Sequence, residues 1–133
     1  RLDTVMGCVS DKFRSGVVIP HWCMKLFINA YTTPGTDMND PRLSPMFYDA
    51  SKFPKYVAVA CGDADTLYRM SFDLMKKISG SASGTNVDGS RKFICVPNEA
   101  HEFNTFGRTR ASQEERDRVE GEAINMIRAS WRQ

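Results

Sequence analysis

Two short apolar runs, each ended by a turn-forming residue, constrain the fold of this chain more than any other feature. The first run is Tyr56–Cys61, which ends at Gly62. The second is Phe93–Val96, which ends at Pro97. Neither run alternates with polar residues, which predicts strands buried on both faces, as in a parallel sheet. Apolar residues at helical spacing predict an amphipathic helix over 66–79, so strand, helix and strand within about 40 residues indicate a right-handed βαβ unit.

Two more helices are predicted to flank this unit. The first begins at Pro20, and its apolar face comprises Cys23, Leu26, Phe27, Ala30 and Tyr31. The last begins with a capping box formed by Ser112 and Glu115, and its apolar stripe comprises Val119, Ala123, Met126, Ile127 and Trp131. A Gly- and Ser-rich segment over 80–90 predicts a surface loop. Together these patterns predict an α/β fold.

Composition excludes several classes of protein. The 133 residues are 41% hydrophobic and 26% charged, which is typical of a soluble globular domain. A net charge of +2 does not favour nucleic acid or a membrane surface as a partner. No apolar run approaches the roughly 20 residues that cross a bilayer. The N-terminus has neither an initiator Met nor the apolar segment of a signal peptide, so we expect an internal cut there.

The four cysteines are Cys8, Cys23, Cys61 and Cys95, and no two of them form a C-x-x-C pair. With only two histidines in the chain, a structural zinc site is not expected. Cys61 and Cys95 each end an apolar run, so we expect buried free thiols on neighbouring strands, although the even number leaves disulfides open. The absence of Asn-x-Ser/Thr acceptors slightly favours a cytoplasmic location and leaves the compartment open.

Acidic residues and a histidine follow the two predicted strands, where open parallel sheets bind their ligands. Asp63 and Asp65 follow the first strand, and His101 follows the second. Adjacent parallel strands lie about 5 Å apart, so both loops are expected at one edge of the sheet. Asp65 is then placed to orient the imidazole of His101, as in a catalytic triad. Taken singly, Asp65 also suits a helix N-cap, and His101 an ordinary loop histidine.

Three motifs, in order, resemble the C-terminal third of the hormone-sensitive-lipase-like esterases. That family shows D-P-x-x-S-P, then G-x-x-D-x-L with the triad acid, then H-G-F with the triad histidine. The matching segments here are D-P-R-L-S-P at 40–45, G-D-A-D-T-L at 62–67 and N-E-A-H-E-F at 98–103. The resemblance covers roughly residues 20–106 and includes the helix before the first motif. Glu102 stands in place of the family glycine, Thr66 stands where proline is frequent, and the loop over 80–90 is longer than usual.

The resemblance implies an α/β-hydrolase, of which this chain is the C-terminal part. About 1–35 would belong to the cap region, and 36–133 would supply the last two strands with their helices. The implied activity is hydrolysis of a small carboxylic ester through an acyl-enzyme, with Asp65 as the triad acid and His101 as the general base. No metal or organic cofactor is implied. The alternatives are a non-catalytic ligand-binding protein of the same fold and an inactive fragment or interaction module.

The sequence lacks a nucleophile motif. Neither G-x-S-x-G nor H-G-G-G occurs, and Ser10, Ser15 and Ser44 do not lie in nucleophile elbows. In the order Ser–Asp–His, the nucleophile is expected upstream of residue 1. Two strands are too few for an independent sheet, so we expect the remainder of the hydrolase, or a second copy through strand pairing, as a partner.

Overall fold

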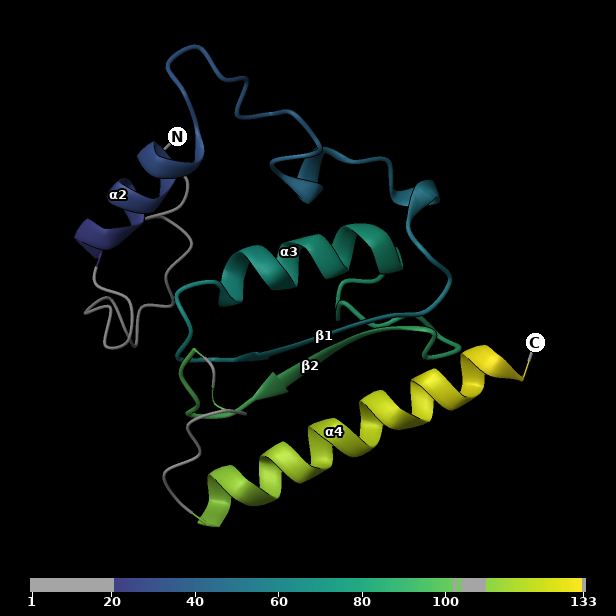
Figure 1. The fold of residues 1–133 in the computed structure, drawn as a ribbon. Coiled ribbons are helices and arrows are strands. Elements are labelled where there is room, and N and C mark those ends of the chain that lie inside the picture. The colour runs from purple at the N-terminus through teal and green to yellow at the C-terminus, as the bar shows by residue number, and fades with distance from the viewer. Residues whose placement is uncertain (1–20, 102, 104–109, 133) are drawn as a thin grey trace.

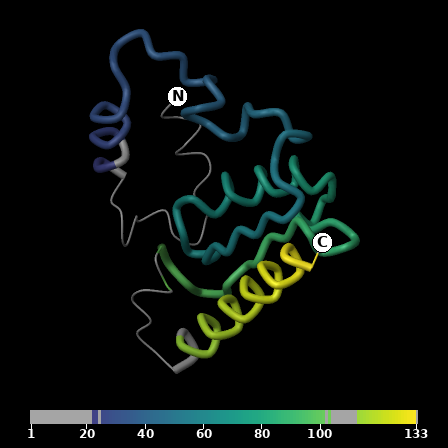
Figure 2. The backbone as a smooth tube through the Cα atoms, turned by 45° about the vertical axis from the view of Figure 1, so that its right-hand side comes forward, coloured from purple at the N-terminus to yellow at the C-terminus, as the bar shows by residue number. Residues whose placement is uncertain are grey.

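The structure is a computed structural model that describes residues 21–101, 103 and 110–132. A two-stranded parallel sheet lies between two helices, α3 on one side and α4 on the other, as the two views agree (Figures 1 and 2). The described elements, in chain order, are α2 (His21–Tyr31), η2 (Pro45–Phe47), η3 (Ala50–Lys52), β1 (Val57–Gly62), α3 (Tyr68–Ser79), β2 (Arg91–Val96) and α4 (Arg110–Trp131). The described residues thus combine helices with a small parallel sheet, which is compatible with the predicted α/β class.

The two predicted strands pair in parallel and in the predicted order. The register runs from Val57 opposite Arg91 to Gly62 opposite Val96. Each strand differs slightly from its predicted bounds: β1 is displaced by one residue, and β2 begins two residues earlier, at Arg91. Helix α3 begins at Tyr68 rather than at residue 66.

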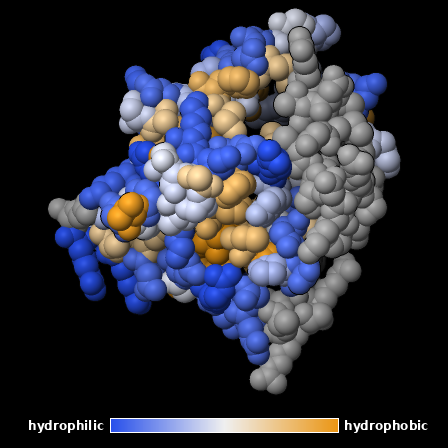
Figure 3. All heavy atoms as spheres, turned by 180° about the vertical axis from the view of Figure 1, so that it is seen from behind, coloured by the Kyte–Doolittle hydropathy of each residue, from blue (hydrophilic) through white to orange (hydrophobic). Residues whose placement is uncertain are grey.

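A small apolar core lies between the sheet and α3. Its buried members are Cys61, Met75, Ile78 and Phe93. The Phe93 ring meets the rings of Tyr68 and Phe72 on α3, with centroids 5.5 Å and 5.1 Å away. Seen from behind, apolar residues gather toward the middle of that face, with hydrophilic residues around them (Figure 3). The buried core residues hold α3 against the strands, and this fixes where the loop after β1 begins.

The prediction that both strands are buried on both faces is wrong for β1. Val57 and Val59 pack against the core on the α3 side, whereas Ala58 and Ala60 are exposed. The reason is the limited cover on the other face, where α4 lies close to β1 without enclosing it. An alternating burial pattern is the ordinary result for a sheet that is covered well on one face.

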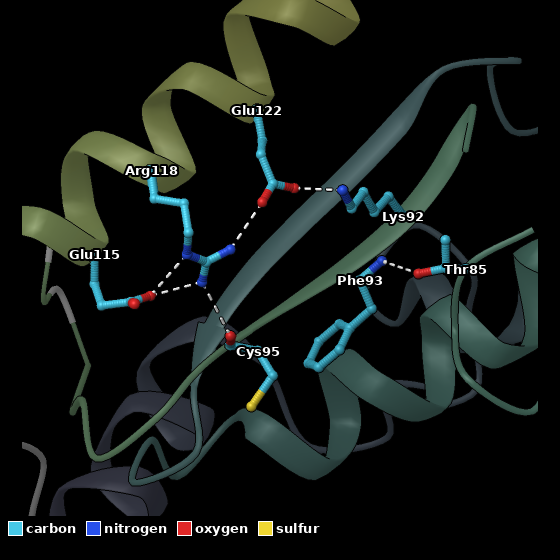
Figure 4. A network of polar contacts seen from close by, with 7 residues as sticks. All are labelled: Thr85, Lys92, Phe93, Cys95, Glu115, Arg118 and Glu122. Atoms are coloured by element: carbon cyan, nitrogen blue, oxygen red, sulfur yellow. Dashed lines mark hydrogen bonds and ion pairs between the residues drawn. The ribbon is translucent and has the colours of Figure 1, made fainter.

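Charged side chains join helix α4 to β2, and three residues of the predicted apolar stripe, Val119, Ala123 and Met126, are half-buried. Lys92 lies 2.5 Å from Glu122, and Arg118 bridges Glu122 and Glu115 at 2.8 Å and 2.6 Å (Figure 4). The lysine also lowers the pKa of Glu122, because its ammonium favours the charged carboxylate. Of the predicted stripe, Ile127 and Trp131 are exposed.

The predicted capping box at the start of α4 is also wrong. The helix begins at Arg110, so Ser112 lies inside its first turn and not at its N-cap. Arg110 and Ala111 both have high helix propensity, and this extends the helix beyond the predicted start. Glu115 instead accepts hydrogen bonds from Arg118, one turn further along.

The predicted helix near the N-terminus is present as α2, but its apolar face is open to solvent. Trp22, Leu26, Phe27 and Tyr31 are 55–80% exposed. Pro20, the predicted first residue, lies outside the described residues. No helix in the described part of the chain is long and apolar enough to span a bilayer.

Candidate active site

The loops that follow β1 and β2 are joined to each other at one edge of the sheet. The Asp63 amide donates to the Val96 carbonyl at 3.0 Å, and the Ala64 amide donates to the Glu99 carbonyl, also at 3.0 Å. The Asn98 amide donates to the Asp63 carboxylate at 2.7 Å. These three bonds place the loop that carries Asp65 beside the loop that carries His101.

Gly62 lets the two loops approach this closely. A Cβ atom at this position would lie 2.0 Å from the Glu99 carbonyl oxygen and 2.5 Å from its carbonyl carbon. These are backbone atoms, which cannot move aside as a flexible side chain can. The close approach of the two loops therefore requires a residue without a side chain at position 62.

The two residues predicted to act together are in contact. The Nδ1 atom of His101 lies 2.9 Å from Oδ2 of Asp65. Asp65 is buried, at 7% exposure, whereas the His101 side chain keeps 30% of its surface exposed. Because Nδ1 faces the carboxylate, Nε2 is the ring nitrogen that remains for a further group. An acid behind a partly exposed imidazole is the arrangement that a general base requires.

Asp65 is not the N-cap of α3, the structural role that the sequence left open, but it does support the turn that leads into this helix. Its Oδ1 accepts a hydrogen bond from the Leu67 amide at 2.8 Å, and its carbonyl oxygen accepts one from the Tyr68 amide at 3.1 Å. The residue at the N-cap of α3 is Leu67, which provides no side-chain bond to the helix. One carboxylate therefore supports the start of α3 with Oδ1 and holds the imidazole with Oδ2.

Sequence reasoning treated Cys61 as a packing residue and missed a polar contact. Its thiol donates to Oδ2 of Asp65 across 3.5 Å, a distance that is normal for sulfur. Burial, followed by the negative charge of Asp65, raises the pKa of the Cys61 thiol to about 12. The group is therefore a neutral donor near pH 7. The four-residue separation of Cys61 and Asp65 in the sequence could have indicated this contact. Separation along the chain does not determine, however, in which direction the Asp65 side chain points.

Asp63, the second acid of this loop, is directed elsewhere. It accepts the bond from Asn98, whose φ of 60° places it in the left-handed region that asparagine tolerates better than most residues. Asp63 thus stabilises the turn after β2. Glu102, which differs from the family pattern, lies outside the described residues.

The D-P-R-L-S-P segment forms a structural turn. The Asp40 carboxylate accepts hydrogen bonds from the guanidinium and the backbone amide of Arg42. These bonds lower the pKa of Asp40 to about 2. The Ser44 amide donates to the Asp40 carbonyl at 2.9 Å and so closes the turn. Lys77 on α3 then donates to the carbonyl of Met46 at 2.5 Å, which fastens the segment to the helix.

Within the described residues, no group of three or more His, Cys, Asp or Glu side chains is arranged to hold a metal ion. No protein-family model, curated protein or solved structure matches this chain. The functional interpretation therefore rests on the geometry of Asp65 and His101 and on the motifs in the sequence.

The expected pair of buried thiols is only half correct. Cys61 and Cys95 are both free and lie opposite each other in the register, but Cys95 is exposed. Its side chain projects to the same side of β2 as the Phe93 ring (Figure 4). On that side of β2, rings of α3 pack against Phe93, whereas Cys95 stays exposed.

This difference predicts two rates of thiol labelling. In a variant with Cys8 and Cys23 replaced by serine, a thiol reagent should modify Cys95 quickly and Cys61 only on unfolding, because Cys61 is buried and protonated. Mass spectrometry of timed samples measures both rates. The fast phase should disappear in Cys95→Ala, and rapid labelling of Cys61 under native conditions would contradict its placement.

Proposed function

We propose that these residues are the C-terminal part of an α/β-hydrolase that cleaves carboxylic esters through an acyl-enzyme. The observation that carries the proposal is the 2.9 Å contact between Asp65 and His101 across the carboxyl ends of two parallel strands. The resemblance of residues 20–106 to the hormone-sensitive-lipase-like esterases adds the reaction class. A triad acid and histidine are expected at this edge of such a sheet.

In the proposed reaction, a serine outside these 133 residues attacks the ester carbonyl, and Nε2 of His101 takes its proton. Asp65 remains ionised, holds the ring through Nδ1 and stabilises the imidazolium. His101 then gives the proton to the departing alcohol. Water, deprotonated by the same nitrogen, releases the carboxylic acid from the serine. The 30% exposure of the His101 side chain agrees with a ring that must meet both a nucleophile and a substrate.

Two surfaces of the described residues are consistent with a larger sheet in the complete enzyme. β1 pairs with β2 along one edge, and its other edge has no strand partner among the described residues. The apolar side chains of α2 are largely exposed. In our proposal, the upstream strands of the hydrolase pair with this edge of β1, and a second copy of the chain is the alternative partner.

The proposal is tested with the full-length protein and a fluorophosphonate probe, which phosphonylates a serine only when a histidine activates it. We expect labelling of one serine outside residues 1–133, located by peptide mass spectrometry, and its loss in His101→Ala. Asp63→Asn is the matched control, since Asp63 binds Asn98 and not the imidazole. An unlabelled wild-type protein would contradict the proposal, and so would labelling that is unaffected by His101→Ala.

A further inference from the structure

Cys61 lies at the end of β1 and joins the apolar core to the candidate site. It is 4% exposed and belongs to the cluster formed with Met75, Ile78 and Phe93. A residue that only filled space there would make apolar contacts alone. The Cys61 sulfur instead lies 3.5 Å from Oδ2 of Asp65, the same oxygen that faces His101.

The buried carboxylate of Asp65 needs donors at both oxygens. An ionised carboxylate that is 7% exposed is costly unless its lone pairs are hydrogen-bonded. Oδ1 receives the Leu67 amide, and Oδ2 receives His101 and the Cys61 thiol. Among these contacts, the thiol is the second donor on the oxygen that orients the imidazole. It therefore limits rotation of the carboxylate about its Cβ–Cγ bond.

The chemistry of the thiol suits a donor and excludes a nucleophile. With a pKa of about 12 the sulfur stays protonated, whereas attack requires the thiolate. The thiol donates to the carboxylate of Asp65. In a catalytic Cys-His pair the cysteine instead contacts the imidazole, which takes its proton. Ser71 on α3 acts on the pKa of this thiol in the opposite direction and so opposes the rise.

We propose that Cys61 is a positioning residue for the acid–histidine pair: its S–H bond holds Oδ2 of Asp65 in the orientation that faces Nδ1 of His101. This proposal rests on the proposed function only for its effect on turnover. The contact between the thiol and the carboxylate is a property of the fold, and it has a consequence for the imidazole even without a substrate.

The kinetic test compares Cys61→Ala with Cys61→Ser in the full-length protein. Alanine removes the donor, and serine supplies an O–H donor on the same Cβ atom. We expect kcat to fall on the order of 5- to 10-fold in Cys61→Ala with KM unchanged, and most of the loss to be recovered in Cys61→Ser. If Cys61 only packed, Cys61→Ser would lose more activity than Cys61→Ala, because burying a hydroxyl costs more free energy than burying a methyl group. Equal kcat in Cys61→Ala and wild type, or no recovery in Cys61→Ser, would overturn the proposal.

A second measurement does not depend on turnover. The proton that Nδ1 of His101 shares with Asp65 should give a downfield ¹H NMR signal, assigned by its loss in His101→Gln. We expect this signal to shift or broaden in Cys61→Ala and to persist in Cys61→Ser. It should also persist in Cys95→Ala, the matched control, which removes the thiol opposite Cys61 on the neighbouring strand. If wild type carries the signal but lacks esterase activity, the proposed function fails while the positioning role is still tested. An unchanged signal in Cys61→Ala would reject that role.

Discussion

Asp65→Asn and His101→Ala in the full-length protein should each lower turnover of a short-chain carboxylic ester by on the order of 10³-fold or more. Removal of the imidazole removes the general base. The side-chain amide introduced by Asp65→Asn would favour the wrong imidazole tautomer, yet its oxygen can still accept the Leu67 amide that Asp65 binds at 2.8 Å. The start of α3 should therefore survive, and the loss should be chemical rather than structural.

Steady-state hydrolysis of a p-nitrophenyl ester, together with circular dichroism of each variant, measures this result. Asp63→Asn is the control on the same loop, because an asparagine oxygen can still accept the bond from the Asn98 amide. It should retain near-normal turnover. If Asp63→Asn is the inactive variant, or if a folded Asp65→Asn or His101→Ala protein stays active, the assignment of the triad acid and base is wrong.

Gly62→Ala is expected to cause the largest loss of stability among conservative substitutions in this region. The added Cβ would lie 2.0 Å from the Glu99 carbonyl oxygen, so the two loops must separate. Their joining bonds, including that from the Ala64 amide to the same carbonyl, would then lengthen. We expect the free energy of unfolding to fall by about 1–3 kcal/mol or more, and ester turnover to fall with it, since the loops carry Asp65 and His101.

Gly121→Ala provides the matched control for this change. Gly121 lies inside α4, and an added Cβ there would meet no atom within 4 Å. Alanine should stabilise that helix by up to about 1 kcal/mol. Urea denaturation of both variants in the full-length protein gives the two free energies. A Gly62→Ala protein as stable as wild type would show that the loops do not approach as closely as described.

Local patterns in the sequence were enough for the framework of this fold. The apolar runs that became β1 and β2 needed only hydrophobicity and flanking turn residues, and the spacing of Leu67, Met70, Leu74 and Ile78 was enough for α3. The rule that parallel strands end at one edge also brought Asp65 and His101 together as candidates. These features depend on residues that are close in sequence or on a general property of sheets, so no long-range contact had to be known.

Contacts between distant segments were not predictable in the same way. The alternating charges around Arg118 and Glu122 favour a solvated helix face, yet these two residues and Lys92 hold α4 on β2. Cys95 was expected to be buried, but it is exposed although Phe93 on the same side of β2 packs against rings of α3. In both cases the side chain suits either environment, and the neighbouring element decides between them.

The sequence by itself determined that the chain forms a strand–helix–strand unit with an acid after one strand and a histidine after the next, because hydrophobic spacing and strand direction are local properties. The family resemblance selected Asp65 as the acid, and only the tertiary structure gives the physical reason why this carboxylate and not that of Asp63 meets the imidazole. Asp63 and Asp65 are two residues apart and chemically identical, and the bond of Asp63 to the Asn98 amide leaves Asp65 to face His101. The direction of a loop side chain is set by such cross-loop bonds and by the close approach at Gly62, which no pattern along one segment encodes.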